Sequence, residues 1–211
     1  SIEIVLVNDP SFNAFVSGRR MFIHTGAILK AESPGEIIGV IAHETGHMAG
    51  GHQFRLRQRA ETAEKLAVLS TILGMGVTVA GAASKNGELA GAGGGLAAGG
   101  VEAARRSLLS YQRGEEMTAD RSAIEYLDRT QQSAAGLLRT FERFADALSL
   151  SGARVDPYRI SHPLPQERIA NLKALAQESP YFGRSDPPEL QLRHDMARAE
   201  IAAYTIGGNV L

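Results

Sequence analysis

The feature that most constrains this chain is the stretch GVIAHETGHMAGGH, residues 39–52, which contains three of the six histidines. Residues four apart share one face of a helix, so His43 and His47 can bind one cation, with Glu44 beside them. The pattern H-E-x-x-H is typical of zinc hydrolases for this reason. The rival interpretation is an ordinary helix with a polar, solvated face. The apolar residues 39–42 favour the metal site, because imidazoles inside a core need partners.

Two histidines do not complete a catalytic zinc site, which uses three protein ligands and a water. In the extended pattern H-E-x-x-H-x-x-G-x-x-H the third ligand is a histidine, but this chain has Gln53 at that position. His52 comes one residue too early. On a continuing helix it lies about 140° around the axis from His47, so we expect it to cap or pack.

The other source of a third ligand is the segment GEEMTAD, residues 114–120. Glu116 and Asp120 are four apart and share a helix face, so one can bind the metal while the other accepts the ring N–H of a ligand histidine. Spacing favours Glu116 as the ligand. Glu115 points about 100° away on the same helix and is expected to be solvated.

Composition narrows the class of protein. A chain of 211 residues fits one domain, or one domain with an appendage. The net charge of −1, without a basic stripe, makes nucleic acid an unexpected partner. Cysteine is absent, so any metal must be bound by His, Asp or Glu. The chain starts with Ser1, which suggests a trimmed fragment whose signal peptide is no longer readable.

The pattern of elements predicts a mainly helical α+β fold with a small N-terminal sheet. Residues 2–7 form an expected strand, and two short strands flank Ser17 and Gly18. SPGE, residues 33–36, has the pattern of a capping box and predicts the start of the helix that carries His43. Further helices are expected over 53–84, from 101 to 130, over 134–149, after the proline-marked turn SHPLP, and over 189–204.

Two segments between the histidines and the glutamates have unusual compositions. Residues 66–84 carry no charge and just reach the length of a transmembrane helix. Their glycine, serine and threonine favour a helix buried in the protein or resting on a membrane surface over one that spans a bilayer. Residues 86–100 are so rich in glycine that we expect a mobile loop, either a linker or a flap over the site.

At this point the sequence resembles a known family. The motifs are NAF (residues 13–15), HETGH followed by His52, EMTAD (116–120) and HPLPQERI (162–169). They occur in the order found in the zinc metallopeptidase family that includes the HtpX heat-shock protease, the CAAX prenyl protease, the mitochondrial Oma protease and the periplasmic beta-barrel assembly-enhancing protease. The resemblance covers most of residues 10–170 and is closest to the periplasmic branch.

The resemblance implies a zincin-like domain of the gluzincin type that binds one zinc ion and cleaves a protein or peptide substrate. Glu116 would be the third zinc ligand, after His43 and His47, and Asp120 would support a ligand histidine. The strand segment with Asn13, Ala14 and Phe15 would bind an extended substrate. Glu44 would be the catalytic base.

The last motif contributes two further residues. By the resemblance, His162 and Arg168 lie over the metal, and His162 either binds zinc as a fourth ligand that keeps the enzyme latent or helps stabilise the oxyanion. Arg168 is a candidate for the same oxyanion role. His24 and His194 match no motif, and we expect structural roles for them.

For the whole chain we expect a metallopeptidase domain over residues 1–180, with 66–100 as an insertion. A helix within 187–211 would lead to a tetratricopeptide-repeat domain. The resemblance implies a periplasmic protein in outer-membrane protein quality control, with the outer-membrane assembly machinery or a peripheral contact with the membrane as its partners. The alternative is a latent, zinc-bound chaperone or assembly factor capped by His162, and a membrane anchor built on 66–84 is the least favoured hypothesis.

Overall fold

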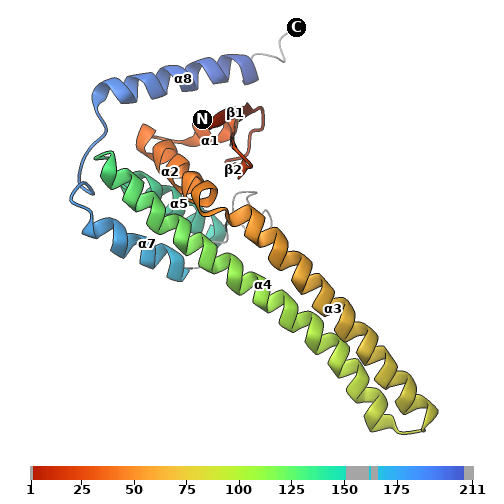
Figure 1. Cartoon of the computed structure of the whole chain (residues 1–211). Coiled ribbons are helices and arrows are strands. Elements are labelled where there is room, and N and C mark those ends of the chain that lie inside the picture. Colours follow the sequence, from red (N-terminus) through yellow and green to blue (C-terminus); the bar gives the residue numbers. More distant parts are fainter. Residues whose placement is uncertain (1, 151–161, 163–165, 207–211) are drawn as a thin grey trace. The chain divides into compact units, whose positions relative to one another are not determined.

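The computed structural model describes residues 2–150, 162 and 166–206, the side chains at 147–150 and 206 excepted (Figure 1). It divides into two compact units. One comprises Ser1–Gly50 and Glu116–Leu211, and the other comprises Gly51–Glu115. The first unit contains a small sheet and most of the helices, and the second is a helical hairpin. The predicted fold class, mainly helical with a small N-terminal sheet, is confirmed.

The sheet has three strands in the order β1-β3-β2. The strands are β1 (Glu3–Val7), β2 (Ala14–Ser17) and β3 (Arg20–His24). β1 pairs with β3 in parallel, and β2 pairs with β3 antiparallel. Gly18 begins the two-residue turn between β2 and β3 with a φ of 61°, a conformation that favours glycine. Met21 and Ile23, two residues apart in β3, lie on the same face of the strand and are buried in the core.

The helices follow the predicted order, except that α1 was not predicted and α4 begins earlier than expected. They are α1 (Thr25–Lys30), α2 (Pro34–Gly50), α3 (His52–Ala83), α4 (Gly87–Arg129), α5 (Ala135–Leu150), α7 (Gln166–Glu178) and α8 (Pro188–Ile206). α2 begins where the capping pattern predicted. Glu36 does not act as a cap, however, because its buried carboxylate accepts a hydrogen bond from Arg143 Nη2 at 2.8 Å. The predicted turn at 163–165 and the tail at 207–211 lie outside the described residues.

The core lies where α2 and α5 meet the sheet. Its largest fully buried apolar side chains are Phe12, Met21, Leu127, Leu137, Phe141 and Leu172. Leu137, Leu138, Phe141 and Phe144 form the inner face of α5. Gly39 allows the two helices to approach closely, because a Cβ there would lie 2.6 Å from the Cβ of Leu137. This tight contact fixes the part of α2 that precedes the histidine motif.

The prediction of a mobile loop at residues 86–100 is wrong, and with it the expected helix start near residue 101. Apart from its first residue, the segment is the beginning of α4, which starts at Gly87. Small residues allow α3 and α4 to pack backbone against backbone. A Cβ at Gly93 would lie 2.4 Å from the carbonyl oxygen of Gly74, and a Cβ at Gly81 would lie 2.3 Å from the nitrogen of Ala90. Gly74, Gly81 and Gly93 are therefore packing positions, and the close contact of the helices compensates for the entropic cost of these residues.

Two settings were expected for the helix over residues 66–84, and burial in the protein, the first of them, is wrong. α3 is the one helix among the described residues that is long and apolar enough to cross a membrane. In the most apolar 18-residue stretch of this helix, only 11% of the residues are buried. Composition could not reveal this, because an apolar helix has the same sequence pattern in a core and on an apolar surface.

Two neighbouring glycines of α4 give opposite predictions for the stability of the hairpin. Gly93→Ala should destabilise it by about 1–3 kcal/mol, because the added methyl group meets the backbone of α3. Gly94→Ala should stabilise it by about 0.5–1 kcal/mol, because nothing lies within 4 Å of the new Cβ and alanine favours helix. Thermal unfolding followed by circular dichroism measures both. If both variants shifted the Tm by the same amount in the same direction, the close packing of Gly93 against α3 would be contradicted.

Candidate metal centre

The site forms because α2 and α4 approach each other at two small residues. Gly46 lies within the histidine motif of α2, and a Cβ there would be 2.9 Å from the carbonyl oxygen of Ala119 in α4. Ala119 is fully buried and lies between Glu116 and Asp120 in the sequence. This close contact brings the carboxylates of one helix against the imidazoles of the other.

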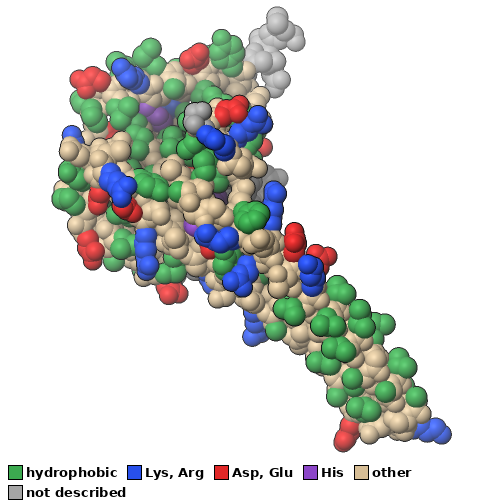
Figure 2. Space-filling model, viewed as in Figure 1, with side chains coloured by type: hydrophobic (Ala, Val, Ile, Leu, Met, Phe, Trp, Pro, Cys, Tyr) green, Lys and Arg blue, Asp and Glu red, His purple; other side chains and the backbone are tan. Residues whose placement is uncertain are grey.

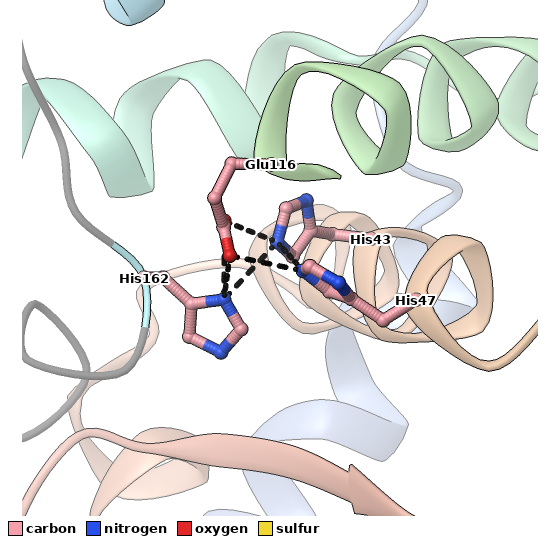
Figure 3. Close-up of side chains that lie close together, drawn as sticks. All are labelled: His43, His47, Glu116 and His162. Atoms are coloured by element: carbon pink, nitrogen blue, oxygen red, sulfur yellow. Dashed lines mark hydrogen bonds and ion pairs between the residues drawn. The ribbon is translucent and has the colours of Figure 1, made fainter. Parts of the chain in front are cut away.

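Four buried side chains converge at this contact (Figure 3). They are His43, His47, Glu116 and His162, and each offers one donor atom within 4.8 Å of all the others. His43 Nε2 lies 3.0 Å from His47 Nε2 and 3.4 Å from Glu116 Oε2. His47 Nε2 lies 3.4 Å from Glu116 Oε1, and His162 Nδ1 lies 3.2 Å from Glu116 Oε2.

The spacing of these atoms fits a small divalent cation. Zinc bonds of about 2.0–2.1 Å in a tetrahedral arrangement separate neighbouring ligand atoms by about 3.3 Å. The separations of 3.0–3.4 Å in the cluster are close to this value. Three imidazole nitrogens and one carboxylate are also a donor set that zinc accepts. The residues present therefore fit the metal that the histidine motif suggests.

Asp120 lies behind the cluster, where it can orient a ligand. Its Oδ1 lies 3.0 Å from His43 Nδ1, on the side of the imidazole that faces away from the other donors. A proton held between these atoms leaves the lone pair of Nε2 directed into the cluster. Burial raises the pKa of Asp120, but the hydrogen bonds from Arg168 and His43 outweigh burial and hold it below its usual range.

Arg168, on α7, binds the carboxylates of Glu116 and Asp120, which both lie on α4. Its Nε donates to Asp120 Oδ2 at 2.6 Å, its Nη2 donates to Asp120 Oδ1 at 2.8 Å, and its Nη1 lies 2.8 Å from Glu116 Oε2. The guanidinium also lies over the ring of Phe141, 4.8 Å from its centroid. The sequence suggested that Arg168 contacts an oxyanion, and it did not predict the pairing of Arg168 with Asp120 and Glu116. Two buried carboxylates on one helix face were the available signal, because they need a compensating charge.

Glu44 lies beside the cluster and outside its set of donor atoms. Its side chain is fully buried, and neither carboxylate oxygen has a hydrogen-bond partner among the described residues. His162 Nε2 lies 3.3 Å from Oε1. Burial raises the pKa of Glu44 above its ordinary value. A buried carboxylate with free lone pairs and a raised pKa is suited to accepting a proton.

The charges of the ligand side chains differ because their neighbours differ. Burial lowers the pKa of His47 to about 4, so this imidazole is neutral at neutral pH and can donate its lone pair. Burial also acts to lower the pKa of His43, but Asp120 and Glu116 outweigh it and raise the value to about 9. Glu116 has a pKa well below its usual range, since the three histidines outweigh its burial. A cation at His43 therefore competes with a proton.

The predicted substrate segment lies at the edge of the sheet. Asn13 directly precedes β2, and Ala14 and Phe15 are its first two residues. β2 ends the strand order of the described sheet and pairs with β3. Two histidines lie outside the cluster, as expected of structural residues. His24 Nδ1 is 2.9 Å from Ser11 Oγ, and His194 Nε2 is 3.1 Å from the carbonyl oxygen of Ala31.

His52 and Glu115 form a separate pair within the hairpin unit. His52 is buried, and its Nε2 lies 2.9 Å from Glu115 Oε2, which also accepts a hydrogen bond from Arg55 at 2.8 Å. His52 thus packs, as expected, and does not join the metal cluster. The expectation of a solvated Glu115 is wrong. Spacing along one helix could not reveal partners that come from another.

An H-E-x-x-H helix whose histidines meet a glutamate from a later helix defines a zincin-like metallopeptidase domain. The sequence model of the family described as Peptidase family M48 matches residues 2–176 of this chain. The chain belongs to this family, and it is therefore a metal-dependent peptidase.

Its curated relatives are longer proteins. The chain is 29% identical over 207 residues to a provisionally named beta-barrel assembly-enhancing protease of Vibrio cholerae serotype O1, covering 96% of this chain and 39% of that protein. It is 27% identical to the beta-barrel assembly-enhancing protease of Yersinia pestis and 26% identical to that of Escherichia coli strain K12, each over 82% of this chain and 34% of the relative. The chain thus spans less than two fifths of the length of these relatives.

Proposed function

We propose that this chain is a zinc-dependent endopeptidase of the gluzincin type, with His43, His47 and Glu116 as the metal ligands. The observation that carries the proposal is the convergence of their donor atoms within 4.8 Å, next to the buried carboxylate of Glu44. A solvated polar helix face would not collect these groups in a water-excluded site. Cleavage of casein, lost on adding a chelator and restored by zinc, tests the proposal.

The residues divide the work of peptide hydrolysis. Zinc, when bound, supplies a Lewis acid that polarises the peptide carbonyl and lowers the pKa of water toward about 7. Glu44 accepts the proton of the attacking water and delivers it to the nitrogen of the leaving amine. Asp120 orients His43, and Arg168 positions Glu116 and Asp120 through its hydrogen bonds. The segment of Asn13, Ala14 and Phe15, where β2 begins, would align an extended substrate by backbone pairing.

A second candidate function rests on the position of His162. Its Nδ1 lies 3.4 Å from His43 Nε2, within the cluster, while its Nε2 lies 3.3 Å from Glu44 Oε1. His162 thus contacts both the ligand set and the base. An imidazole in this place fills the coordination position that a substrate or water needs. The chain would then be a latent peptidase, or a zinc-bound chaperone or assembly factor that does not cleave.

The variant His162→Ala distinguishes a capping role from a catalytic one. If His162 caps the metal, its removal should increase casein cleavage by about tenfold, the gain expected when a capped state outweighs the open state by about 1.4 kcal/mol. Zinc content serves as the control and should stay unchanged, because His43, His47 and Glu116 remain. A fall in cleavage with zinc still bound would contradict the cap and assign His162 to oxyanion stabilisation.

We further propose a cellular role from the relatives. Their names connect them with beta-barrel assembly, which supports the proposal of a periplasmic protein whose substrates are misassembled outer-membrane proteins. Residues 1–180 would be the peptidase domain, with 187–211 leading toward a tetratricopeptide-repeat domain. Incubation with an outer-membrane protein in its unfolded and folded forms tests the role. Equal cleavage of both forms would count against quality control.

A further inference from the structure

The α3–α4 hairpin exposes an unusual amount of apolar surface (Figure 2). In the uncharged part of α3, from residue 66 onward, seven large apolar side chains are more than half exposed: Leu66, Val68, Leu69, Ile72, Leu73, Met75 and Val79. At 100° per residue they occupy about half of the helix circumference, and small residues face α4 on the other half. Leu89, Leu96 and Val101 extend the exposed apolar surface onto α4. Apolar patches of this size on soluble proteins mark a binding surface.

The polar groups inside this apolar segment are satisfied within their own helix. Residues 66–84 contain four hydroxyl side chains, and each donates to the carbonyl oxygen four residues earlier. Ser70 bonds to Leu66 at 2.8 Å, for example, and Thr78 bonds to Gly74 at 2.9 Å. Backbone hydrogen bonds are satisfied by the helices themselves. The segment can therefore leave water without losing hydrogen bonds, which is the requirement that lipid imposes.

The two arms of the hairpin change from charged to uncharged at the same level. Gly100 packs against Ser70, so Lys65 and Glu102, the last charges before the uncharged stretches, lie near one another along the hairpin. Beyond them α3 runs uncharged over residues 66–84, a length of about 28 Å at 1.5 Å per residue. This length is close to the hydrocarbon thickness of a bilayer, about 30 Å. Lys85 and Glu88 are the charges at the tip.

We propose that the outer part of the hairpin, residues 66–101, inserts into a lipid bilayer. A second copy of the chain would cover one side of α3 only. The exposed apolar side chains of α3 spread over about half of the helix circumference, and a bilayer can contact all of them at once. The charged base of the hairpin, residues 51–65 and 102–115, has seven Lys and Arg against four Glu, which suits anionic headgroups. The inward seam of glycine and alanine is the packing that helix pairs use in lipid.

Flotation with vesicles of phosphatidylethanolamine and phosphatidylglycerol tests this proposal without using peptidase activity. The chain should float with the vesicles and stay bound in 0.5 M NaCl. Ile72→Glu, which places a charge on the exposed face, should weaken partitioning by at least about tenfold. Leu192→Glu is the matched control, because Leu192 is equally exposed on α8, and it should leave partitioning unchanged.

Three results would overturn the proposal. The chain could remain in the aqueous fraction, or release completely in high salt, which would indicate a contact of charges alone. It could also sediment as a dimer that Ile72→Glu makes monomeric, without binding vesicles, which would assign the apolar face to a second copy. Circular dichroism of Ile72→Glu should match that of the unaltered chain, so that lost partitioning reports the surface and not unfolding.

Discussion

Replacing Glu44 with glutamine should abolish peptide hydrolysis while the metal stays bound. Glutamine has nearly the same shape but cannot accept a proton from water, and a general base contributes about 10²–10⁴-fold to the rate. Glu44 lies outside the set of donor atoms formed by His43, His47, Glu116 and His162, so the metal keeps its ligands. The rate of casein cleavage and the zinc content of the same sample measure both halves of this result.

The control for Glu44→Gln is Glu36→Gln. Glu36 is a second buried glutamate of α2, and its carboxylate pairs with Arg143, away from the donor atoms of the metal cluster. Its replacement should lower stability and leave most of the cleavage activity of the folded chain intact. If Glu44→Gln kept activity within a factor of ten of the unaltered chain, Glu44 would not be the base. If it lost zinc, the loss of activity would have another cause.

Binding of zinc should stabilise the fold strongly. The ligands come from α2 and α4, which are far apart in the sequence, so the unfolded chain does not offer the same site. A ligand at about 1,000 times its Kd stabilises the native state by about 4 kcal/mol. For a chain of 211 residues this corresponds to a rise in Tm of about 8–16 °C between the chelated and the zinc-loaded forms.

Two adjacent glutamates provide the control for this stabilisation. Glu116→Gln removes a carboxylate of the cluster and should abolish most of the rise in Tm. Glu115→Gln removes the neighbouring carboxylate, which pairs with His52 and Arg55, and should keep the rise even if the starting Tm is lower. Differential scanning calorimetry with and without zinc measures all three proteins. An equal rise in Glu116→Gln would show that zinc binds elsewhere.

The parts of the fold that sequence predicted depend on local signals. Pro34 marks the start of α2, and the alternation over Met21 and Ile23 identifies a half-buried strand. The helix period alone places His43 and His47 on one face, and it does the same for Glu116 and Asp120. These patterns need no knowledge of what packs against them, because spacing within one element determines them.

The parts that sequence did not predict depend on a partner from elsewhere in the chain. Glycine disfavours a helix by itself, but Gly93 packs against Gly74 and Thr78 of α3, where only a residue without a side chain fits. The exposure of Leu69 and Ile72 cannot be derived from their hydrophobicity. Arg168 lies 48 residues after Asp120 in the sequence, and no local pattern connects the two. Tertiary contacts decided each of these cases.

The most direct test of the central claim, that one divalent ion is bound by His43, His47 and Glu116, is the zinc content of the purified chain combined with zinc-edge X-ray absorption. The account predicts one zinc per chain, with nitrogen and oxygen ligands at about 2.0–2.1 Å. It also predicts loss of that zinc in His43→Ala/His47→Ala and in Glu116→Ala. Full zinc content in these variants, with an unchanged absorption spectrum, would contradict it.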